Sequence, residues 1–313
     1  MIHIVGGAGF LGTAIAQQLE SEGLPFKIFD KALKDSEYVD VTNPDSLKKM
    51  GPTETLINLA AEHKDDVRPV DLYHRVNVDG ARDICEYCRE NGVNTIIFTS
   101  SVAVYGAMSA PATEQTPRNP DTAYGESKKK AEDIYLEWAK EQPASRTLII
   151  VRPTAIFGEG NRGNVHRLLY QIARRRFVMF GAGRNKKSLA YVDNVAEFIL
   201  FSMRLKGGVH IYNYADKPDL EMKSLVRKVR AKLFNRDDIG PRLPGWLGIA
   251  IGAAFDVAAT ALRKDFPVSA ARVKKFMAPT VIDSQAHQIG FKASISLTEG
   301  LDKTLSREFS SKL

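Results

Sequence analysis

The sequence of 313 residues contains only two cysteines and no run of about 20 apolar residues that could span a membrane. Two cysteines cannot build a disulfide framework, and neither a second cysteine pair nor a nearby histidine pair completes a zinc site. Cys85 and Cys88 form one C-x-x-C in a helical pattern, which we interpret as buried helix residues rather than as a redox pair. The first apolar run leads directly into a glycine-rich turn, so we expect no export signal. Reduced thiols without an export signal predict a cytoplasmic protein.

Repeats and low-complexity segments are also absent from the sequence, in which 44% of residues are hydrophobic and 26% are charged. These proportions exclude a disordered, collagen-like or coiled-coil protein. The length favours one large domain, or a large and a small one. The net charge is +7, and residues 200–280 hold the excess, with fifteen Lys and Arg against seven Asp and Glu. We expect no nucleic-acid partner, because these basic residues lack interleaved aromatic residues and a recognised motif.

Short apolar runs alternate with amphipathic stretches in the first half of the chain. The runs are rich in β-branched and aromatic residues, which favours strands, and they cover 2–5, 26–29, 55–59, 95–98 and 147–151. A further short strand candidate precedes Asp40. Helices are predicted over 10–22, 71–91 and 124–141. This alternation predicts an α/β fold of the Rossmann class, with a doubly wound parallel sheet and helices on both faces.

A glycine-rich turn connects the first predicted strand to the first predicted helix. Gly6, Gly9 and Gly12 have the spacing G-x-x-G-x-x-G, which lets the backbone approach a pyrophosphate at the helix N-terminus. Asp30 ends the second predicted strand, 18 residues after Gly12, where a carboxylate can accept hydrogen bonds from an adenosine ribose. Because its charge would repel a 2′-phosphate, NAD is favoured over NADP.

Two further signals point to redox chemistry. Tyr124 and Lys128 are spaced i, i+4 and therefore lie on one helix face. A tyrosine normally titrates near pH ~10, and a neighbouring ammonium and a nicotinamide cation would favour its phenolate. Ser101 follows the strand predicted at 95–98, at the edge where open α/β sheets hold their ligands. A hydroxyl there can donate a hydrogen bond to a substrate oxygen that is being oxidised.

Together these residues resemble the extended short-chain dehydrogenases/reductases of the NAD-dependent epimerase/dehydratase family. The resemblance covers nearly the whole chain and includes, in family order, the glycine motif, 58–61, 101–106, the Tyr124/Lys128 pair, 152–153 and 191–193. It implies that Ser101, Tyr124 and Lys128 are the catalytic residues. It also implies that NAD is held by Gly6, Gly9, Phe10, Leu11, Gly12, Asp30, Asp40, Val41, Leu59, Ala60, Ala61, Tyr124 and Lys128.

The same resemblance divides the chain into two domains. Residues 1–158 with about 190–215 would form the NAD-binding Rossmann domain. Residues 159–189 and 216–313 would form a smaller C-terminal α/β domain that binds the substrate. Arg152 would begin the substrate side of the cleft, and the expected substrate contacts are Ser101, Arg162, Asn164 and Lys187.

Four longer segments are similar to one subgroup of the family, and they cover 61–67, 152–164, 212–219 and 268–276. That subgroup comprises bacterial 4-epimerases that interconvert N-acetylglucosamine and N-acetylgalactosamine on undecaprenyl diphosphate. The resemblance therefore implies transient oxidation at C4 by bound NAD. The alternatives are a UDP-sugar 4-epimerase and an NAD-dependent dehydrogenase or reductase of a keto-sugar or sterol-like alcohol. The complete Ser/Tyr/Lys set argues against a non-catalytic NAD-binding regulator.

Departures from the family pattern reduce the number of family reactions that this chain is expected to catalyse. Family dehydratases carry an Asp-Glu pair, and decarboxylases a Glu, where this chain has Val102 and Ala103. These side chains cannot titrate, which disfavours both reactions. Lys187 stands where nucleotide-sugar epimerases often have a phosphate-binding Arg, and a lysine binds phosphate without the fork geometry.

A metal is not expected. His63 lies in the loop after the third strand. Two interpretations stay open for it: a residue of the cleft, or a histidine whose hydrogen bonds serve only the structure. Glu62, Asp65 and Asp66 are suitable metal ligands, but the chemistry needs no metal ion.

The C-terminal region contains an apolar stretch that could contact a membrane surface. Residues 246–255 are uncharged and belong to an apolar stretch at 244–264 with flanking basic residues. We weigh a buried helix and a helix in a membrane interface equally, since a polyprenyl-linked substrate stays in the bilayer. The interfacial alternative would place the enzyme peripherally on the cytoplasmic face of the inner membrane. The resemblance also implies a homodimer through the helices at 71–91 and 124–141.

Overall fold

The chain divides into two compact units, and the computed structural model describes residues 1–64, 67–262 and 269–309. The first unit comprises Met1–Ile156, Ala190–Ala215 and Ile282–Ile295. The second unit comprises Phe157–Leu189, Asp216–Val281 and Ser296–Leu313. The predicted division differs in residues 282–295, which belong to the first unit. A backbone hydrogen bond from Asp283 to Ala112 and the bonds between Asn194 and Ile295 hold this segment there.

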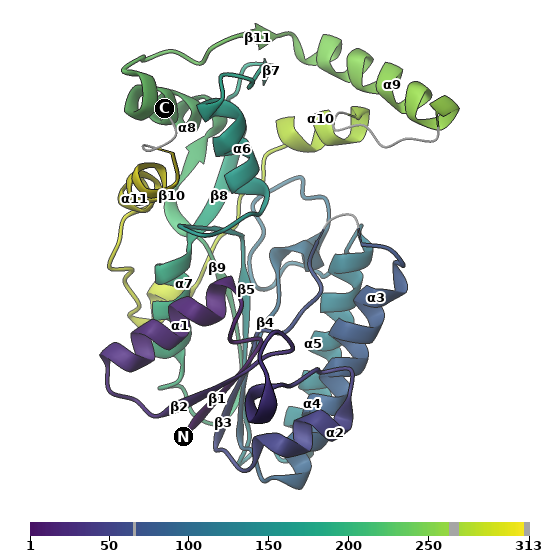
Figure 1. Ribbon diagram of the computed structural model, residues 1–313, viewed down its shortest axis with the longest axis vertical. Helices are drawn as coiled ribbons and strands as arrows, with labels where there is room; N and C mark the ends of the chain where they lie inside the picture. The colour runs from purple at the N-terminus through teal and green to yellow at the C-terminus, as the bar shows by residue number, and fades with distance from the viewer. Residues whose placement is uncertain (65–66, 263–268, 310–313) are drawn as a thin grey trace. The chain divides into compact units, whose positions relative to one another are not determined.

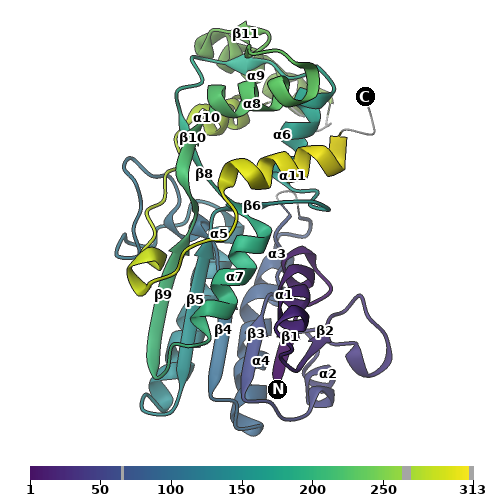
Figure 2. The ribbon, with the colours of Figure 1, turned by 90° about the vertical axis from the view of Figure 1, so that its left-hand side faces the viewer.

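A six-stranded sheet forms the centre of the first unit, and every neighbouring pair of strands is parallel. Figure 2 shows the strand order β2-β1-β3-β4-β5-β9. The strands are β1 (Ile2–Val5), β2 (Phe26–Phe29), β3 (Thr55–Asn58), β4 (Thr95–Thr99), β5 (Thr147–Pro153) and β9 (Gly208–Tyr214). The order reverses beside β1, which creates a switch point between β1 and β3, where ligands bind in such sheets. The prediction of a doubly wound parallel sheet is confirmed.

Helices cover both faces of this sheet (Figure 1). On one face, α1 (Phe10–Ser21) packs against α7 (Val192–Ser202). On the other face, α4 (Gly80–Glu90) packs against α5 (Ala123–Glu141). Shorter elements complete the unit: η1 (Asp35–Glu37), α2 (Pro44–Leu47), η2 (Lys48–Met50), α3 (Asp71–Tyr73), the π-helical η3 (His74–Asp79), η4 (Val102–Tyr105) and η5 (Ala286–Ile289).

The main core of the first unit lies between the sheet and the α4/α5 layer. Tyr135 and Trp138 of α5 are fully buried there and pack in the same cluster as Phe98 of β4. Cys85 and Cys88 of α4 belong to this cluster, and each is 1% exposed. Burial raises the pKa of Cys85 to about 12 and that of Cys88 well above its usual value. Their placement confirms the interpretation as buried helix residues, because neither side chain can readily become a reactive thiolate.

Two local predictions differ from the structure. The strand expected before Asp40 is a loop, in which the 3₁₀ turn η1 precedes a single bridge between Asp30 and Tyr38. The helix expected over 71–91 is interrupted by the π-helical η3. Beyond it, Gly80 begins α4 directly against Val41, where a Cβ on the glycine would lie 2.8 Å from the valine side chain.

The second unit contains two small sheets and five helices among its described residues. The three-stranded sheet has the order β10-β8-β6, and the other sheet pairs β11 with β7. The strands are β6 (Ala155–Phe157), β7 (Met179–Phe180), β8 (Lys186–Tyr191), β10 (Asp216–Glu221) and β11 (Arg242–Leu243). The helices are α6 (Asn164–Ala173), α8 (Met222–Phe234), α9 (Gly245–Leu262), α10 (Ala270–Met277) and α11 (Leu297–Phe309). The bounds of β6 and β8 run across the boundary between the units.

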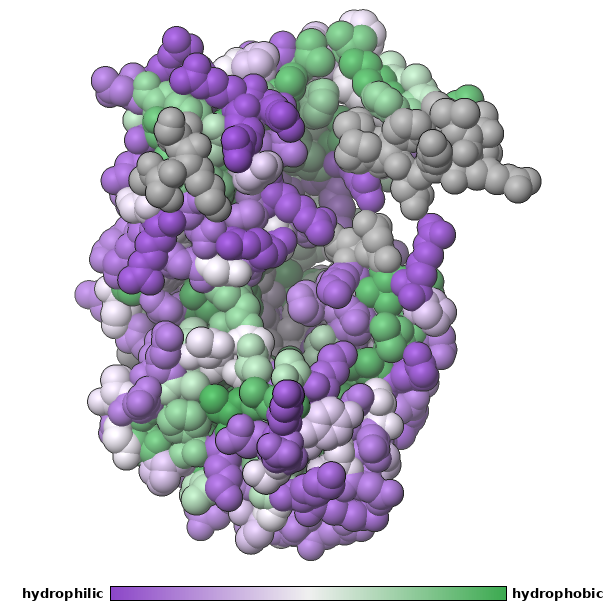
Figure 3. All heavy atoms as spheres, viewed as in Figure 1, coloured by the Kyte–Doolittle hydropathy of each residue, from purple (hydrophilic) through white to green (hydrophobic). Residues whose placement is uncertain are grey.

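Over residues 245–257, whose burial the structure describes, the helix α9 is buried on one side and exposed on the other. Its small residues contact α10 and β7: a Cβ on Gly252 would lie 2.5 Å from the backbone nitrogen of Ala270, and one on Gly248 2.4 Å from the Phe180 ring. Trp246 and Val257 are each 71% exposed. Figure 3 shows hydrophobic residues gathered along α9, and we call the exposed side the α9 apolar face, formed by Trp246, Ala250, Ala253 and Val257. Within the described part of the chain, no helix is long and apolar enough to cross a membrane.

Candidate active site

The turn between β1 and α1 packs closely against neighbouring backbone, which leaves no room for side chains at its glycines. Gly6 has a φ of +78°, and a Cβ there would lie 2.6 Å from the backbone nitrogen of Ala60. A Cβ on Gly12 would lie 2.5 Å from the carbonyl oxygen of Gly7, so the helix starts in direct contact with the turn. Among the described residues, no side chain caps the N-terminus of α1. Uncapped N–H groups at a helix N-terminus are of the kind that bind a diphosphate, as the sequence predicts for this turn.

Asp30 lies beside this turn, at the end of β2. Its carboxylate accepts a hydrogen bond of 3.2 Å from the backbone nitrogen of Ala8 and one of 2.9 Å from that of Ala32. The negative charge is thereby fixed next to the glycine turn. This placement fits a ribose with a free 2′-hydroxyl and disfavours a 2′-phosphate.

The remaining residues predicted to surround the dinucleotide lie in the loops after β2 and β3. The backbone nitrogen of Leu59 donates to Val5, and that of Ala60 donates to the side chain of Asn58 at 3.0 Å. These bonds hold the residues 59–61 beside the glycine turn. Val41 is buried, and the adjacent Asp40 carboxylate is engaged with Thr42. Together with Gly6 and Asp30, this cradle fits an adenine dinucleotide at the switch point of the sheet.

Ser101 lies two residues after the end of β4. It is the N-cap of the 3₁₀ segment η4, and its hydroxyl accepts a hydrogen bond of 3.2 Å from the backbone nitrogen of Ala103. The side chain of Ser101 is half-buried. Val102 and Ala103 follow it, and they bring no titratable group to this part of the site.

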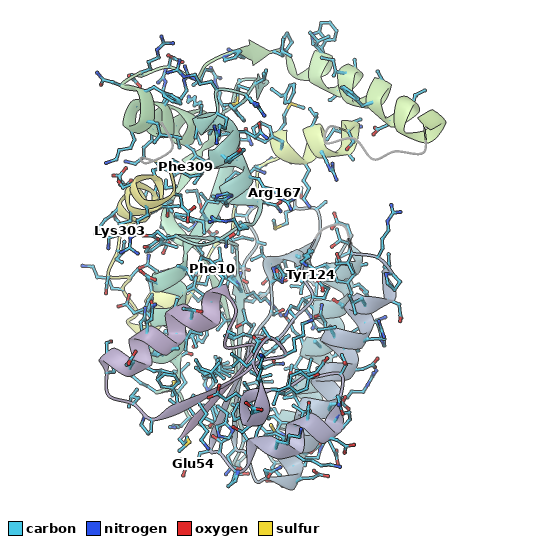
Figure 4. The ribbon with its side chains drawn as sticks, in the orientation of Figure 1. Phe10, Glu54, Tyr124, Arg167, Lys303 and Phe309 are labelled. Carbon is cyan, nitrogen blue, oxygen red and sulfur yellow. The ribbon has the colours of Figure 1, made fainter. Side chains whose placement is uncertain are left out.

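Tyr124 and Lys128 lie in the first two turns of α5, which begins after Thr122 caps the nitrogen of Gly125 at 3.1 Å. Tyr124 is half-buried, and its ring centroid is 6.2 Å from that of Tyr73. Figure 4 shows Tyr124 at the start of α5 and Phe10 at the start of α1, both at the carboxyl end of the sheet. The predicted catalytic and cofactor residues of the first unit thus lie along one edge of one sheet.

Lys128 is almost completely buried, with an exposed fraction of 3%. Its Nζ donates a hydrogen bond of 2.8 Å to the carbonyl oxygen of Thr99 and lies 4.7 Å from the centroid of the Phe98 ring. Burial lowers the pKa of Lys128 to about 7, although the carboxylate of Glu132 acts in the opposite direction. An amine with a pKa near neutrality can respond to charge that appears beside it.

Arg152, which we expect to begin the substrate side of the cleft, is 2% exposed and engaged within the first unit. Its role towards the substrate stays a prediction. Its guanidinium forms two hydrogen bonds to Glu132, of 2.8 and 2.6 Å, and one of 2.8 Å to the hydroxyl of Tyr105. The sequence analysis did not single out Glu132, although its position four residues after Lys128 is a signal that could have found it.

Asn77 is a second residue that the sequence analysis missed. Its amide exchanges hydrogen bonds of 2.8 and 3.0 Å with the backbone of Glu62 and donates one of 2.8 Å to the hydroxyl of Ser127. It therefore ties the loop after β3 to α5, one residue before Lys128. Nothing in its local sequence distinguishes it, because both partners are distant along the chain.

Besides Ser101, three residues are predicted to contact the substrate. All three belong to the second unit, and their role stays a prediction. Arg162 pairs with Glu308 at 2.8 Å, and Asn164 begins α6. Lys187 donates hydrogen bonds to the carbonyl oxygens of Lys275 and Ala278 at the end of α10, of 3.2 and 2.7 Å. Burial lowers the pKa of Lys187 to about 8, and the charge of Lys275 contributes in the same direction.

The loop after β3 offers no metal site within the described residues. Glu62 uses one carboxylate oxygen to accept hydrogen bonds from the backbone of His63 and Lys64. The His63 ring contacts the carbonyl oxygen of Ala61 at 3.5 Å. Asp65 and Asp66 lie outside the described residues. Across the part of the chain that the structure describes, no group of three candidate ligands could hold a metal ion.

The fold defines a Rossmann-type protein, and its predicted NAD-binding residues and Ser/Tyr/Lys set lie at one edge of the parallel sheet. The chain belongs to the NAD dependent epimerase/dehydratase family, whose model matches residues 2–215. NAD is the cofactor of this family, and the residues of the first unit fit it.

Individual relatives agree with this assignment. The chain is 43% identical, over 98% of its length and 95% of the relative, to the N-acetyl-alpha-D-glucosaminyl-diphospho-ditrans,octacis-undecaprenol 4-epimerase of Escherichia coli O157:H7. It is 25% identical, over 80% of its length and 87% of the relative, to the UDP-glucose 4-epimerase of Vibrio cholerae. The fold matches the UDP-Glc/GlcNAc 4-epimerase of Campylobacter jejuni with a TM-score of 0.76 at 16% identity, covering 100% of this chain and 99% of the other.

Proposed function

We propose that this protein is an NAD-dependent 4-epimerase that interconverts N-acetylglucosamine and N-acetylgalactosamine linked to undecaprenyl diphosphate. The observation that carries the proposal is the joint placement of Ser101, Tyr124 and the buried Lys128 beside the NAD cradle. The 43% identity to an epimerase of a lipid-linked substrate, over nearly the whole of both chains, supports the choice of carrier. UDP is the alternative carrier. The similarity to a UDP-glucose 4-epimerase makes epimerisation of a UDP-sugar a better-supported alternative than a net dehydrogenase or reductase reaction.

The chain's own residues accept the proton of the substrate and stabilise the charges that develop during the reaction. Tyr124, as phenolate, accepts the proton of the sugar C4 hydroxyl. Ser101 donates a hydrogen bond to the same oxygen as it becomes a carbonyl. Lys128 stabilises the phenolate by its charge, at i+4 on the same helix face. Bound NAD⁺ supplies a reversible acceptor for the C4 hydrogen, so that the 4-keto sugar can turn and be reduced on its other face.

The residues after Ser101 favour epimerisation over elimination. Dehydration needs an additional acid and base beside the sugar, and Val102 and Ala103 occupy the positions where family dehydratases carry them. Epimerisation needs one base and one reversible redox step. A net dehydrogenase or reductase would use the same Ser/Tyr/Lys set but would exchange its cofactor with solvent in each cycle.

The α9 apolar face supports a lipid-linked substrate. Trp246 and Val257 are three helical turns apart on the exposed side of α9, and exposed basic residues of α10 lie on the neighbouring helix: Arg272, Lys274 and Lys275. Apolar burial and attraction of about 1 kcal/mol for each basic residue near anionic lipid act together at a membrane surface. We assign this face to peripheral contact with the cytoplasmic leaflet, where a polyprenyl-linked sugar resides. The flanking residues 263 and 264 lie outside the described residues, and the homodimer stays a prediction.

The experiment presents N-acetylglucosamine to the purified protein on two carriers, UDP and polyprenyl diphosphate, and follows the configuration at C4 by NMR. Inversion on the lipid carrier alone supports the proposal. Inversion on UDP alone would replace it with a nucleotide-sugar epimerase. No inversion on either, with net reduction of nicotinamide by another alcohol, would mean that the family is right and the reaction is wrong.

A further inference from the structure

The carboxylate of Glu132 is the centre of a buried polar network that the mechanism does not use. Its side chain is 0% exposed and receives hydrogen bonds from three other side chains. Arg152 donates two of them, Ser100 donates one of 2.5 Å, and Arg118 donates one of 3.0 Å. All four residues belong to the first unit. The network therefore connects α5, the end of β4, β5 and the loop before α5.

Ser100 connects this network to the catalytic residues. Its backbone nitrogen donates a hydrogen bond of 2.7 Å to Val151, and its hydroxyl is fixed by Glu132. The residue before it, Thr99, provides the carbonyl oxygen that holds Lys128, and the residue after it is Ser101. One buried carboxylate thus fixes the peptide segment that positions two of the three catalytic groups.

The charge of Glu132 also acts on Lys128, one helical turn earlier. No carboxylate among the described residues forms a direct ion pair with Lys128, whose Nζ is bonded to a neutral carbonyl oxygen. Burial lowers the pKa of Lys128 to about 7, and Glu132 opposes this shift. Other titratable groups lie near the two residues: Tyr124 and Asp133 on α5, Arg152 on β5 with Tyr105 bonded to it, Arg118 in the preceding loop, and Tyr73, which packs on Tyr124.

A purely structural role would not explain the choice of these groups. A buried ion pair is expensive to desolvate, and an apolar replacement of similar volume is often equally stable. Arg152 and Glu132 fill a site between α5 and β5 that apolar side chains fill elsewhere in the same core. What an apolar pair could not do is fix the Ser100 hydroxyl and place a negative charge one turn from Lys128.

We propose that Glu132 is a positioning residue for this active site, which orients the Thr99–Ser101 segment through Ser100 and keeps Lys128 cationic during turnover. The proposal rests on the epimerase function for its kinetic test. The protonation of Lys128 can be measured without any substrate, so the two proposals can fail separately.

The test compares three variants of the full-length protein loaded with NAD. Glu132→Gln removes the charge but keeps the shape, and Ser100→Ala removes only the hydrogen bond from the Ser100 hydroxyl to the carboxylate. Asp133→Asn is the matched control, because Asp133 also binds Arg118, at 2.7 Å, but is half exposed and has no contact with Ser100. The measurements are kcat and KM against pH, NAD content, thermal unfolding, and the NMR titration of Lys128 in protein labelled with ¹³C-lysine.

We expect Ser100→Ala to lower kcat about 10- to 100-fold with little change in KM, since small misplacements of reacting groups have effects of this size. Glu132→Gln should lower kcat and move the titration of Lys128, together with the alkaline limit of activity, by about 1 unit to lower pH. Asp133→Asn should change neither. If Glu132→Gln does not fold, the kinetics of Ser100→Ala and Glu132→Asp test whether Glu132 orients the Thr99–Ser101 segment.

Two results would overturn the proposal: an unmoved Lys128 titration in Glu132→Gln, or kinetic losses in Ser100→Ala that disappear once the folded fraction is taken into account. If the wild-type protein inverts no sugar while the Lys128 titration still moves, the function is wrong and the electrostatic role of Glu132 stands.

Discussion

The side-chain nitrogen of Lys128 donates a hydrogen bond of 2.8 Å to the carbonyl oxygen of Thr99, the last residue of β4. This bond ties α5, which carries Tyr124, to the strand end that carries Ser101. It also keeps an amine in a site where its charge is poorly solvated. Holding Lys128 in the proposed active site therefore costs stability at pH values where the amine is charged, which leads to a prediction about pH.

Lys128→Met should stabilise the NAD-free protein while abolishing activity. Burial lowers the pKa of Lys128 from 10.5 to about 7 in the folded state. Below pH 7 the folded protein must carry a buried ammonium, and this penalty is relieved as pH rises from about 7 towards 10.5. The gain from the substitution should be on the order of a few kcal/mol at pH 6 and should fade towards pH 10. Chemical denaturation at a series of pH values measures it, and a variant less stable at pH 6 would contradict the assignment.

Tyr124→Phe should abolish epimerisation and leave NAD bound. The substitution removes the proton acceptor but keeps the ring that packs on Tyr73. Loss of a general base typically lowers the rate about 10²- to 10⁴-fold. Turnover and the nucleotide released on denaturation are measured in the same preparation. Wild-type activity in the variant would exclude Tyr124 as the base, and loss of NAD would make its role structural.

Gly6→Ala should lose NAD, whereas Gly23→Ala should not. Both glycines have a positive φ, of +78° and +67°, so both substitutions strain the backbone, by about 1–3 kcal/mol. Only at Gly6 does the new Cβ also meet the loop after β3, 2.6 Å from Ala60, while nothing lies within 4 Å of it at Gly23. Calorimetric titration of NAD into the apo-proteins separates the two effects. Equal NAD affinity in both variants would argue against a cofactor at this turn.

The double variant Trp246→Ser/Val257→Ser should bind anionic vesicles more weakly than the wild type. Removing two exposed apolar groups from the α9 apolar face reduces burial at the interface without opening the core. Val70→Ser is the control, because Val70 is 59% exposed and lies in the other unit. Co-sedimentation with vesicles of anionic and of neutral lipid measures the effect. Equal binding by all three proteins would leave the α9 apolar face without a membrane role.

Local spacing was sufficient to predict the parts of the site that depend on short segments. The glycine turn, Asp30 and the Tyr124/Lys128 pair lie where a strand–turn–helix unit and a 3.6-residue helical repeat place them. The buried network of Arg152 could not be predicted, because its partners, Glu132 and Tyr105, are 20 and 47 residues away and are brought to it only by the packing of α5 and η4 on β5. The grouping of 282–295 with the first unit could not be predicted for the same reason, since Ala112 and Asn194, which hold this segment, are distant along the chain.

The most direct test of the central claim uses N-acetylglucosamine carrying deuterium at C4, on the carrier that supports turnover, with enzyme whose NAD has not been replaced. Reversible oxidation at C4 by a cofactor that stays bound predicts that the epimerised sugar keeps its deuterium at C4, with none in the solvent and no net reduced nicotinamide. Deuterium in the water, or a product that has exchanged C4 hydrogen with it, would contradict the account.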